Sequence, residues 1–362
     1  MKKNLIFFLP NFNYGGAGKS ITTICKYLDK KKYNINVISL GKNSYKKSLK
    51  KYCKNIYELK SKKTFLSFFE IKKILKKYNK NNLLFISNIN YANILSLFFL
   101  KVLSSYKVVI VERTPLEELD YYYSNLDFIK KYLMKILIFF IYRKADLTIG
   151  NSKKTSLDLN KLTKKKGEFI YPILEKKLTK NLIKKKSKNF NILSIGRLSK
   201  EKRFEDIIKS IGLINKKFFY LILLGDGSDR ERLSEYIKRF KINGKLIPYS
   251  NKLEKEYLKK ADLFISSSDF EGFPNAVVQA INYGVPVLST KSHGGINEIL
   301  INGKGGFFYR KRDIKDLSKK IVFIKNNYQY SIKKTKYAKK NLNIFLVKKI
   351  IYKFEKLIDK II

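Results

Sequence analysis

The sequence predicts an α/β protein with two parallel-sheet domains in tandem. Short apolar, β-rich runs alternate with longer helical patterns, and this alternation stops near residue 176 and restarts near residue 190. Continuously apolar strands that are separated by helices indicate a parallel sheet covered on both faces. With 362 residues, the chain is long enough for two domains with separate cores.

The first predicted domain covers residues 1–175. Its candidate strands are Leu5–Leu9, Ile35–Leu40, Asn55–Leu59, Leu83–Ser87, Val108–Glu112, Leu147–Gly150 and Glu168–Tyr171. Helices are predicted between them, for example over Ser20–Leu28, Phe65–Tyr78 and Leu126–Arg143. A lysine-rich polar run then covers residues 176–190 and is typical of a linker.

The second predicted domain covers residues 191–330. Its candidate strands are Asn191–Ile195, Tyr220–Leu224, Lys245–Pro248, Leu263–Ser266, Val285–Ser289 and Phe307–Tyr309. Its candidate helices are Phe204–Ile214, Asp229–Phe240, Leu253–Lys260, Ala276–Tyr283 and Asp313–Lys325. Because α/β proteins bind ligands at the carboxyl ends of their strands, we expect a site in a cleft between these ends of the two domains.

The last segment, residues 331–362, is predicted to be one long amphipathic helix. Its apolar residues recur at i, i+3, i+4 and i+7 and form one stripe. They are Val347, Ile350, Ile351, Phe354, Leu357, Ile358 and Ile361. We expect the stripe to pack on a domain and close the chain; an interfacial membrane helix is the alternative.

The net charge is extreme, because 78 Lys and Arg face 29 Asp and Glu and leave +49. A basic surface attracts nucleic acid. However, the lysines are spread over the whole chain, Lys, Ile, Asn, Phe and Tyr are abundant, and Trp is absent, as expected of an AT-rich coding sequence. We therefore expect no specific nucleic-acid partner. Whether the positive charge serves a function or reflects the coding sequence, it favours contact with anionic membrane surfaces.

Nothing in the sequence predicts export or a membrane span. Cys25 and Cys53 lack metal-ligand spacing and are too few for a disulfide framework, which fits a reducing cytoplasm. The apolar run Leu5–Leu9 is shorter than the ~7–15 residues of a signal-peptide core. The runs Ile94–Leu100 and Leu133–Tyr142 are shorter than the ~20 residues of a spanning helix.

The stretch Ala261–Leu300 has the pattern of an anion-binding site. A strand is followed by a polar loop, a helix that opens at Pro274–Asn275, and a stop at Gly284. The helix N-terminus would offer free N–H groups to a ligand beside Glu271. The alternative is that Glu271 only caps this helix.

Two further motifs point to phosphate. N-Y-G-G-A-G-K-S, residues 13–20, nearly matches a P-loop, but Asn13 stands where the first glycine should be. The motif could instead be a glycine turn whose backbone N–H groups approach a diphosphate, and such a turn does not need Lys19. In S-I-G-R-L-S-K-E-K-R, Arg197 and Lys202 follow a strand and suit a diphosphate, although they could be two solvated charges. The G-D-G-S-D turn at residues 225–229 is given no chemical role. His293, the only histidine, is interpreted as a turn residue, since it supports neither a triad nor a metal site.

The motifs G-R-L-S-K-E-K, G-D-G, A-D-L-F-I-S-S-S-D-F-E-G-F-P-N, A-I-N-Y-G-V-P-V and G-G-I-N-E-I-L follow one another between residues 196 and 300. In this order and spacing they closely resemble the donor-binding domain of glycosyltransferase family 4, retaining enzymes with the GT-B fold of two Rossmann-like domains. S-N-I-N-Y-A-N-I and V-E-R-T-P in the first half are similar to a branch that acts in lipid-linked oligosaccharide, capsule and O-antigen assembly.

The resemblance implies a hexosyltransferase that moves a sugar from a UDP-linked donor, with retention and without a cofactor or metal, to a lipid-linked or growing glycan acceptor. Arg197 and Lys202 would stabilise the departing diphosphate, and Glu271 would bind the donor sugar. The other donor-binding residues would be Gly15, Gly16, Pro248, Tyr249, Ser250, Gly272, Phe273, Pro274, Asn275, Gln279, Gly294, Gly295 and Glu298.

Two positions depart from the family pattern. A second glutamate would bind the ribose hydroxyls, but this chain has Gln279 there, which lacks the charge. We expect weakened or altered donor binding; a homologue that binds without turnover is the alternative. Many members also use a histidine in the first domain, and this chain has none there. The acceptor-side candidates are Asn88, Asn93, Glu112 and Arg113.

Basic and aromatic residues at Tyr121–Tyr123 and Lys130–Arg143 are predicted to dock the protein on the anionic inner face of the cell membrane. The alternative is that Leu133, Leu137 and Phe140 are core residues of a packed helix. A P-loop NTPase and a nucleic-acid-binding protein remain as rival functions.

Overall fold

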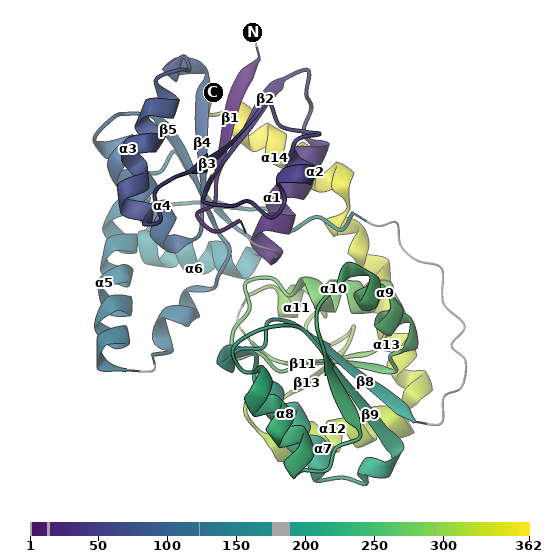
Figure 1. Cartoon of the computed structure of the whole chain (residues 1–362). Coiled ribbons are helices and arrows are strands. Elements are labelled where there is room, and N and C mark those ends of the chain that lie inside the picture. The colour runs from purple at the N-terminus through teal and green to yellow at the C-terminus, as the bar shows by residue number, and fades with distance from the viewer. Residues whose placement is uncertain (1, 13–14, 123, 176–188, 293) are drawn as a thin grey trace. The chain divides into compact units, whose positions relative to one another are not determined.

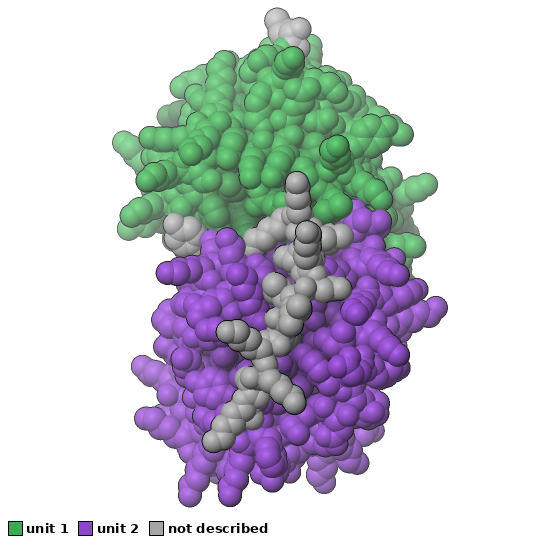
Figure 2. All heavy atoms as spheres, turned by 90° about the vertical axis from the view of Figure 1, so that its right-hand side faces the viewer, with its two compact units in different colours: residues 1–175, 345–362 green, residues 176–344 purple. Residues whose placement is uncertain are grey.

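The computed structural model describes residues 2–12, 15–122, 124–175, 189–292 and 294–362. The chain divides into two compact units, which Figure 2 shows in green and purple. Unit 1 contains residues 1–175 and 345–362, and unit 2 contains residues 176–344. Of the predicted linker, residues 176–188 lie outside the described residues.

The described residues of unit 1 form a seven-stranded parallel sheet in the order β3-β2-β1-β4-β5-β6-β7 (Figure 1). The strands are β1 (Lys3–Phe8), β2 (Tyr33–Leu40), β3 (Asn55–Leu59), β4 (Leu83–Asn88), β5 (Lys107–Glu112), β6 (Leu147–Gly150) and β7 (Glu168–Phe169). The predicted strands of the first half are all present, with ends that differ by at most two residues. Side chains alternate across the sheet, so Leu5 and Phe7 join one core and Ile6 and Phe8 join another.

Helices cover both faces of this sheet. One layer contains α1 (Gly16–Tyr27), α2 (Lys46–Leu49) and α14 (Val347–Asp359). The other contains α3 (Thr64–Leu75), α4 (Asn90–Ser96), the π-helical turn η2 (Leu97–Val102), α5 (Asn125–Ile141) and α6 (Lys153–Thr163). Short 3-10 turns are η1 (Lys80–Asn82), η3 (Leu116–Asp120) and η4 (Tyr142–Lys144). Since α1 begins at Gly16, the second half of the P-loop-like motif is helical, and Asn13 lies outside the described residues.

The described residues of unit 2 form a six-stranded parallel sheet in the order β10-β9-β8-β11-β12-β13. The strands are β8 (Phe190–Ile195), β9 (Phe219–Leu224), β10 (Gly244–Ile247), β11 (Leu263–Ser266), β12 (Val287–Thr290) and β13 (Phe307–Tyr309). The helices are α7 (Phe204–Gly212), α8 (Arg230–Arg239), α9 (Asn251–Lys260), α10 (Asn275–Asn282), α11 (Ile296–Ile299), α12 (Ile314–Asn326) and α13 (Tyr328–Asn341), with turns η5 (Lys200–Lys202), η6 (Lys216–Phe218) and η7 (Leu342–Phe345). Every strand and helix predicted in this half is present, with ends shifted by at most two residues.

The C-terminal segment differs from the single helix that the sequence predicted. Helix α13 ends at Asn341, and a 3-10 turn leads to Leu346, whose backbone is extended. Leu346 forms a parallel bridge with Leu174, and Leu174 N donates to Phe345 O (2.8 Å), so these backbone groups cannot continue a helix. Helix α13 belongs to unit 2 and α14 to unit 1.

The apolar stripe of α14 packs in the core of unit 1, as the packing prediction required. Ile350, Phe354 and Ile358 are buried in the same core as Leu5 and Phe7, on one face of the sheet. Asp359 accepts hydrogen bonds from Lys3 Nζ and Tyr33 Oη, both at 2.8 Å. Across the described part of the chain, no helix has the length and apolar character that crossing a membrane requires.

Candidate functional site

The predicted catalytic residues lie at the carboxyl edge of the sheet of unit 2. Arg197 and Lys202 follow β8, and Glu271 follows β11, which pairs with β8 in parallel. Because the carboxyl ends of neighbouring parallel strands meet at one edge, the loops that carry these residues are adjacent. The structure thus brings together residues that are about seventy positions apart in the sequence.

Lys202 and Glu271 are in direct contact. Lys202 Nζ donates a hydrogen bond to Glu271 Oε1, and Ser268 Oγ donates to the same oxygen at 3.1 Å. The side chains of Lys202 and Glu271 are about one-fifth exposed, so a ligand can reach both. Arg197 is exposed, and no described residue pairs with its guanidinium group. Lys202 and Arg197 can bind an anion, while Glu271 can accept hydrogen bonds from hydroxyl groups.

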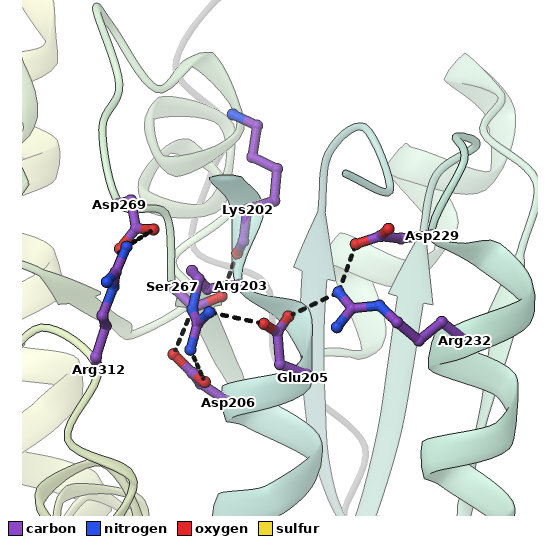
Figure 3. Close-up of polar contacts among 9 residues, drawn as sticks. All are labelled: Lys202, Arg203, Glu205, Asp206, Asp229, Arg232, Ser267, Asp269 and Arg312. Atoms are coloured by element: carbon purple, nitrogen blue, oxygen red, sulfur yellow. Dashed lines mark hydrogen bonds and ion pairs between the residues drawn. The ribbon is translucent and has the colours of Figure 1, made fainter. Parts of the chain in front are cut away.

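A network of buried carboxylates and partly exposed arginines follows the turn after β8 (Figure 3). Arg203 has a left-handed backbone (φ 53°) and donates to Asp206 through Nε (3.1 Å) and Nη2 (2.8 Å). Its Nη1 lies 3.0 Å from Glu205, which is 3.6 Å from Arg232. Arg232 pairs with Asp229 at 2.6 Å. Burial lowers the pKa of Arg203, but the carboxylates of Asp206, Glu205 and Asp269 together raise it by more, so the guanidinium stays charged.

A second ion pair fixes the loop after β11. Asp269 is 3% exposed and accepts two hydrogen bonds from Arg312, at 3.0 Å from Nε and 2.8 Å from Nη2 (Figure 3). Asp269 N also donates to Glu201 O at 2.8 Å. Ser267 Oγ donates to Lys202 O at 2.7 Å. These bonds hold together the two loops that carry the predicted catalytic residues.

The glycine pair after β12 packs directly against Glu271. Gly294 has φ +98°, and a Cβ there would lie 1.8 Å from Glu271 O. Gly295 N donates to Gly272 O at 2.9 Å. Glu298 follows on α11 and is half-buried. His293, which precedes this pair, lies outside the described residues.

Helix α10 begins at Asn275, after Gly272, Phe273 and Pro274. Its N-cap residue, Pro274, makes no side-chain capping bond, and Glu271 accepts hydrogen bonds from Lys202 and Ser268. Gly284, with φ +75°, follows its end, as the sequence predicted. Within α10, Gln279 Oε1 is buried and has no hydrogen-bond partner among the described residues. It remains available to a ligand hydroxyl only if the local side chains move.

The loop after β10 contains Pro248, Tyr249 and Ser250. Tyr249 N donates to Asp226 Oδ2 (2.9 Å), and Tyr249 Oη donates to Glu254 Oε2 (2.8 Å). Ser250 Oγ caps α9 by accepting from Leu253 N (3.2 Å). Asp226 belongs to the G-D-G-S-D turn, to which the sequence reasoning gave no chemical role. In the structure it holds the loop whose residues were predicted to bind the donor.

In unit 1, Gly15 and Gly16 start helix α1 and are exposed. Gly15 N donates to Tyr45 Oη (3.3 Å), which in turn donates to Gly15 O (3.2 Å). Lys19 is exposed on the first turn of α1. The backbone at the glycine pair is therefore accessible, as contact with a phosphate would require.

Two of the acceptor-side candidates line a pocket in unit 1. Asn88 and Arg113 share it with Ser20, Asn151 and Tyr171, and apolar side chains form its remaining walls. Arg113 Nε donates to Asn88 Oδ1 at 3.0 Å. Burial lowers the pKa of Arg113 to about 10, so the side chain is charged at neutral pH.

The other two candidates are buried beneath this pocket. Glu112 is 1% exposed and accepts a hydrogen bond from Tyr142 Oη at 2.8 Å. Asn93 is fully buried and donates to the same Tyr142 Oη at 3.3 Å. Burial raises the pKa of Glu112 to about 7, although the bond from Tyr142 acts in the opposite direction. Among the described residues, no group of three or more His, Cys, Asp or Glu side chains could hold a metal ion.

Residues 175–341 match the family model of glycosyl transferases group 1. The N-acetylgalactosamine-N,N'-diacetylbacillosaminyl-diphospho-undecaprenol 4-alpha-N-acetylgalactosaminyltransferase of Campylobacter jejuni is 33% identical over 172 residues, which cover 46% of this chain and 47% of that protein. The lipopolysaccharide 1,6-galactosyltransferase of Escherichia coli K12 is 28% identical over 127 residues, which cover 33% and 35%. The chain therefore spans less than half the length of these relatives.

Solved structures are similar over the whole chain. HepE from Anabaena, in complex with UDP and glucose, superposes with a TM-score of 0.80 at 17% identity, covering 99% of this chain and 100% of HepE. Sucrose-phosphate synthase from Thermosynechococcus elongatus has a TM-score of 0.84 at 14% identity, covering 99% of both chains. At this identity the likeness shows the fold. The chain thus has the GT-B fold with two parallel-sheet α/β domains, and the sequence of its second domain matches glycosyl transferases group 1.

Proposed function

We propose that this protein is a retaining glycosyltransferase that moves a sugar from a UDP-linked donor to a lipid-linked or growing glycan acceptor. Its main support is the pairing of Lys202 with Glu271 at the strand edge that also presents Arg197. The name of the Campylobacter relative includes diphospho-undecaprenol, which supports a lipid-linked acceptor. The presence of UDP and glucose in the HepE structure supports a UDP-linked donor.

In the proposed reaction, the bond between the anomeric carbon and the diphosphate oxygen breaks. The acceptor hydroxyl oxygen bonds to that carbon on the same face, and its proton leaves with the diphosphate. Arg197 and Lys202 neutralise the charge that develops on the diphosphate. Lys202 leaves Glu271 for the phosphate when the donor binds, and Glu271 then accepts hydrogen bonds from the sugar hydroxyls.

The acceptor would bind beside Arg113 and Asn88 in unit 1, where a charged guanidinium lines a small, largely apolar pocket with room for about one water molecule. Glu112 and Asn93 would support this site from below, because both are buried and bonded to Tyr142. The proposed place of action is the cytoplasmic, inner face of the cell membrane. No cofactor or divalent metal takes part, so EDTA should leave the rate unchanged.

A thermal-shift screen with UDP-, GDP- and ADP-sugars tests the donor proposal. A ligand at ~100 times its dissociation constant adds about 2.7 kcal/mol to the free energy of unfolding. UDP-sugars should raise the melting temperature, and Arg197→Ala should abolish that shift. The matched control is Arg310→Ala, because Arg310 is an exposed arginine of the same unit outside the site. Transfer that survives both Arg197→Ala and Glu271→Gln would refute the proposal.

The same screen separates the rival functions. Loss of nucleotide binding in Lys19→Ala, with Arg197→Ala unaffected, would favour a P-loop NTPase. A second candidate function is that of a homologue that binds nucleotide sugars without turnover, because Gln279 replaces the charged ribose ligand. Binding of a UDP-sugar without release of UDP in the presence of any competent lipid-linked acceptor would favour it.

A further inference from the structure

Helix α5 turns its apolar side outward. Of its 17 residues, all of them described, only Ile138 is buried. Six large apolar side chains, between 37% and 69% exposed, recur every three or four residues and so form one stripe along the helix. They are Leu126, Ile129, Leu133, Ile136, Leu137 and Phe140. The alternative that Leu133, Leu137 and Phe140 are core residues is therefore wrong.

Three charged residues of α5, Asp127, Lys131 and Lys135, are only partly exposed and lie beside the rest of unit 1. Lys131 pairs with Asp127 (3.2 Å) and donates to Tyr121 O. Lys135 pairs with Asp120 at the end of η3. A surface helix of a soluble protein normally shows the reverse arrangement, with polar residues facing solvent. The ion pairs and hydrogen bonds of Lys131 and Lys135 thus hold α5 with its apolar stripe facing outward.

The elements beside α5 in the same layer add more apolar side chains. Exposed residues of α3, of η2 and of the position after η2 are Phe65, Leu66, Phe69, Phe98, Val102 and Leu103. The two elements are joined by aromatic contacts, since the rings of Phe65 and Phe68 each lie 5.2 Å from that of Phe99. Helices α3, α4 and α5 cover the same side of the sheet (Figure 1), so their outer surfaces point away from it together. We name these exposed residues and the α5 stripe the outer apolar face.

We propose that the outer apolar face docks unit 1 on an anionic lipid bilayer. Exposed apolar surface of this extent marks an interaction site in a soluble protein, and an apolar stripe with basic neighbours suits the interface of a membrane. Exposed basic residues on or next to these elements are Lys62, Lys63, Lys73 and Lys130. Each favours an anionic surface by ~1 kcal/mol. A second copy of the chain is a less favourable partner, because two chains that each have a net charge of +49 repel each other. This surface does not depend on the proposed activity.

The absence of tryptophan from the sequence allows a single-site probe of this surface. Phe140→Trp places one fluorophore on the stripe, and Leu213→Trp places one at an equally exposed position of unit 2. Vesicles of phosphatidylglycerol with phosphatidylcholine should shift the emission of Phe140→Trp to the blue and allow brominated lipids to quench it. Vesicles of phosphatidylcholine alone, or Leu213→Trp with either vesicle, should show no such change. Equal shifts at the two positions would overturn the proposal.

Removing the stripe gives a quantitative test by co-sedimentation. Full burial of one such side chain favours binding about tenfold to a hundredfold, so half-exposed residues contribute about fivefold each. The double variant Leu133→Ser with Phe140→Ser should therefore lower the vesicle partition coefficient about thirtyfold. The control Leu213→Ser with Tyr352→Ser removes equally exposed residues elsewhere and should bind as before.

Thermal unfolding of the stripe variant checks that the fold is intact, because both positions are exposed. Unchanged vesicle binding in the folded variant would show that charge alone recruits the protein and would overturn the proposal. So would light scattering that finds a dimer without vesicles and a monomer after the stripe is removed, because the face would then pair two copies.

Discussion

Replacing Gly294 by alanine should displace Glu271 from its working position. A Cβ at Gly294 would lie 1.8 Å from Glu271 O and 2.6 Å from Gly272 O, and both are backbone atoms. Real Cβ atoms essentially never come closer than 3.0 Å to another heavy atom, so the two loops must separate by more than 1 Å. The methyl group cannot be accommodated by rotating a side chain.

The expected loss can be divided into two parts. Alanine at φ +98° costs about 1 kcal/mol of stability, because a Cβ disfavours the left-handed region. Displacing a reacting group by about 1 Å costs about a hundredfold in rate. The overlap with the backbone of the neighbouring loop adds about 1–3 kcal/mol to the loss of stability. We therefore expect a moderate loss of stability and a large loss of transfer.

Gly303→Ala is the matched control. Gly303 has a similar backbone angle, φ +91°, but a Cβ there would be no closer than 3.5 Å to its nearest neighbour, the ring of Phe308. Both variants bear the cost of the backbone angle, and only Gly294→Ala bears the overlap as well, so it should lose more stability in urea unfolding. Only Gly294→Ala should lose the rate of UDP release from the donor that the thermal-shift screen identifies. Equal rates for the two variants would refute the claim that this contact positions Glu271.

Three further substitutions test other parts of the structure. Burial raises the pKa of Glu112 from 4.5 to about 7, so its contribution to stability is present below pH 4.5 and is lost as the pH rises through about 7. In urea unfolding, the free energy of unfolding should fall by about 3 kcal/mol over this range, and Glu112→Gln should remove that fall. Equal pH profiles of the two proteins would contradict this prediction. Arg312→Ala leaves the buried Asp269 carboxylate unpaired and should cost about 2 kcal/mol, whereas the same change in an Asp269→Asn background should cost much less. Gln279→Glu should tighten UDP binding about tenfold in calorimetry, because a carboxylate accepts stronger hydrogen bonds than an amide. It should also destabilise the ligand-free protein, because the side-chain oxygen is buried. Unchanged affinity would place the ribose elsewhere.

The fold could be predicted because its signals are local. Buried parallel strands are continuously apolar, and nearly all of them were found within two residues. The location of the site followed from topology, since Lys202 and Glu271 lie in the loops that follow two neighbouring strands. The predicted start of α1, at Ser20, is four residues too late, because this helix begins with glycines that do not follow the apolar pattern.

Features that depend on tertiary contacts could not be predicted. The network around Arg203 joins residues from separate helices, and a run of charges does not indicate which of them will be buried. The periodicity of α5 shows that it is amphipathic but not which side faces the sheet. The break at Leu346 arises from pairing with Leu174, which is far away in the sequence.

The position of α14 has a consequence for how the protein folds during synthesis. This helix supplies Ile350, Phe354 and Ile358 to the core of unit 1, whose sheet is otherwise complete by Glu175. At ribosomal rates of about 5–20 residues per second, the intervening stretch takes roughly ten to thirty seconds to make. The part of this sheet face that α1 and α2 do not cover therefore stays exposed while unit 2 is made, and a chaperone that shields it would be needed most in that interval.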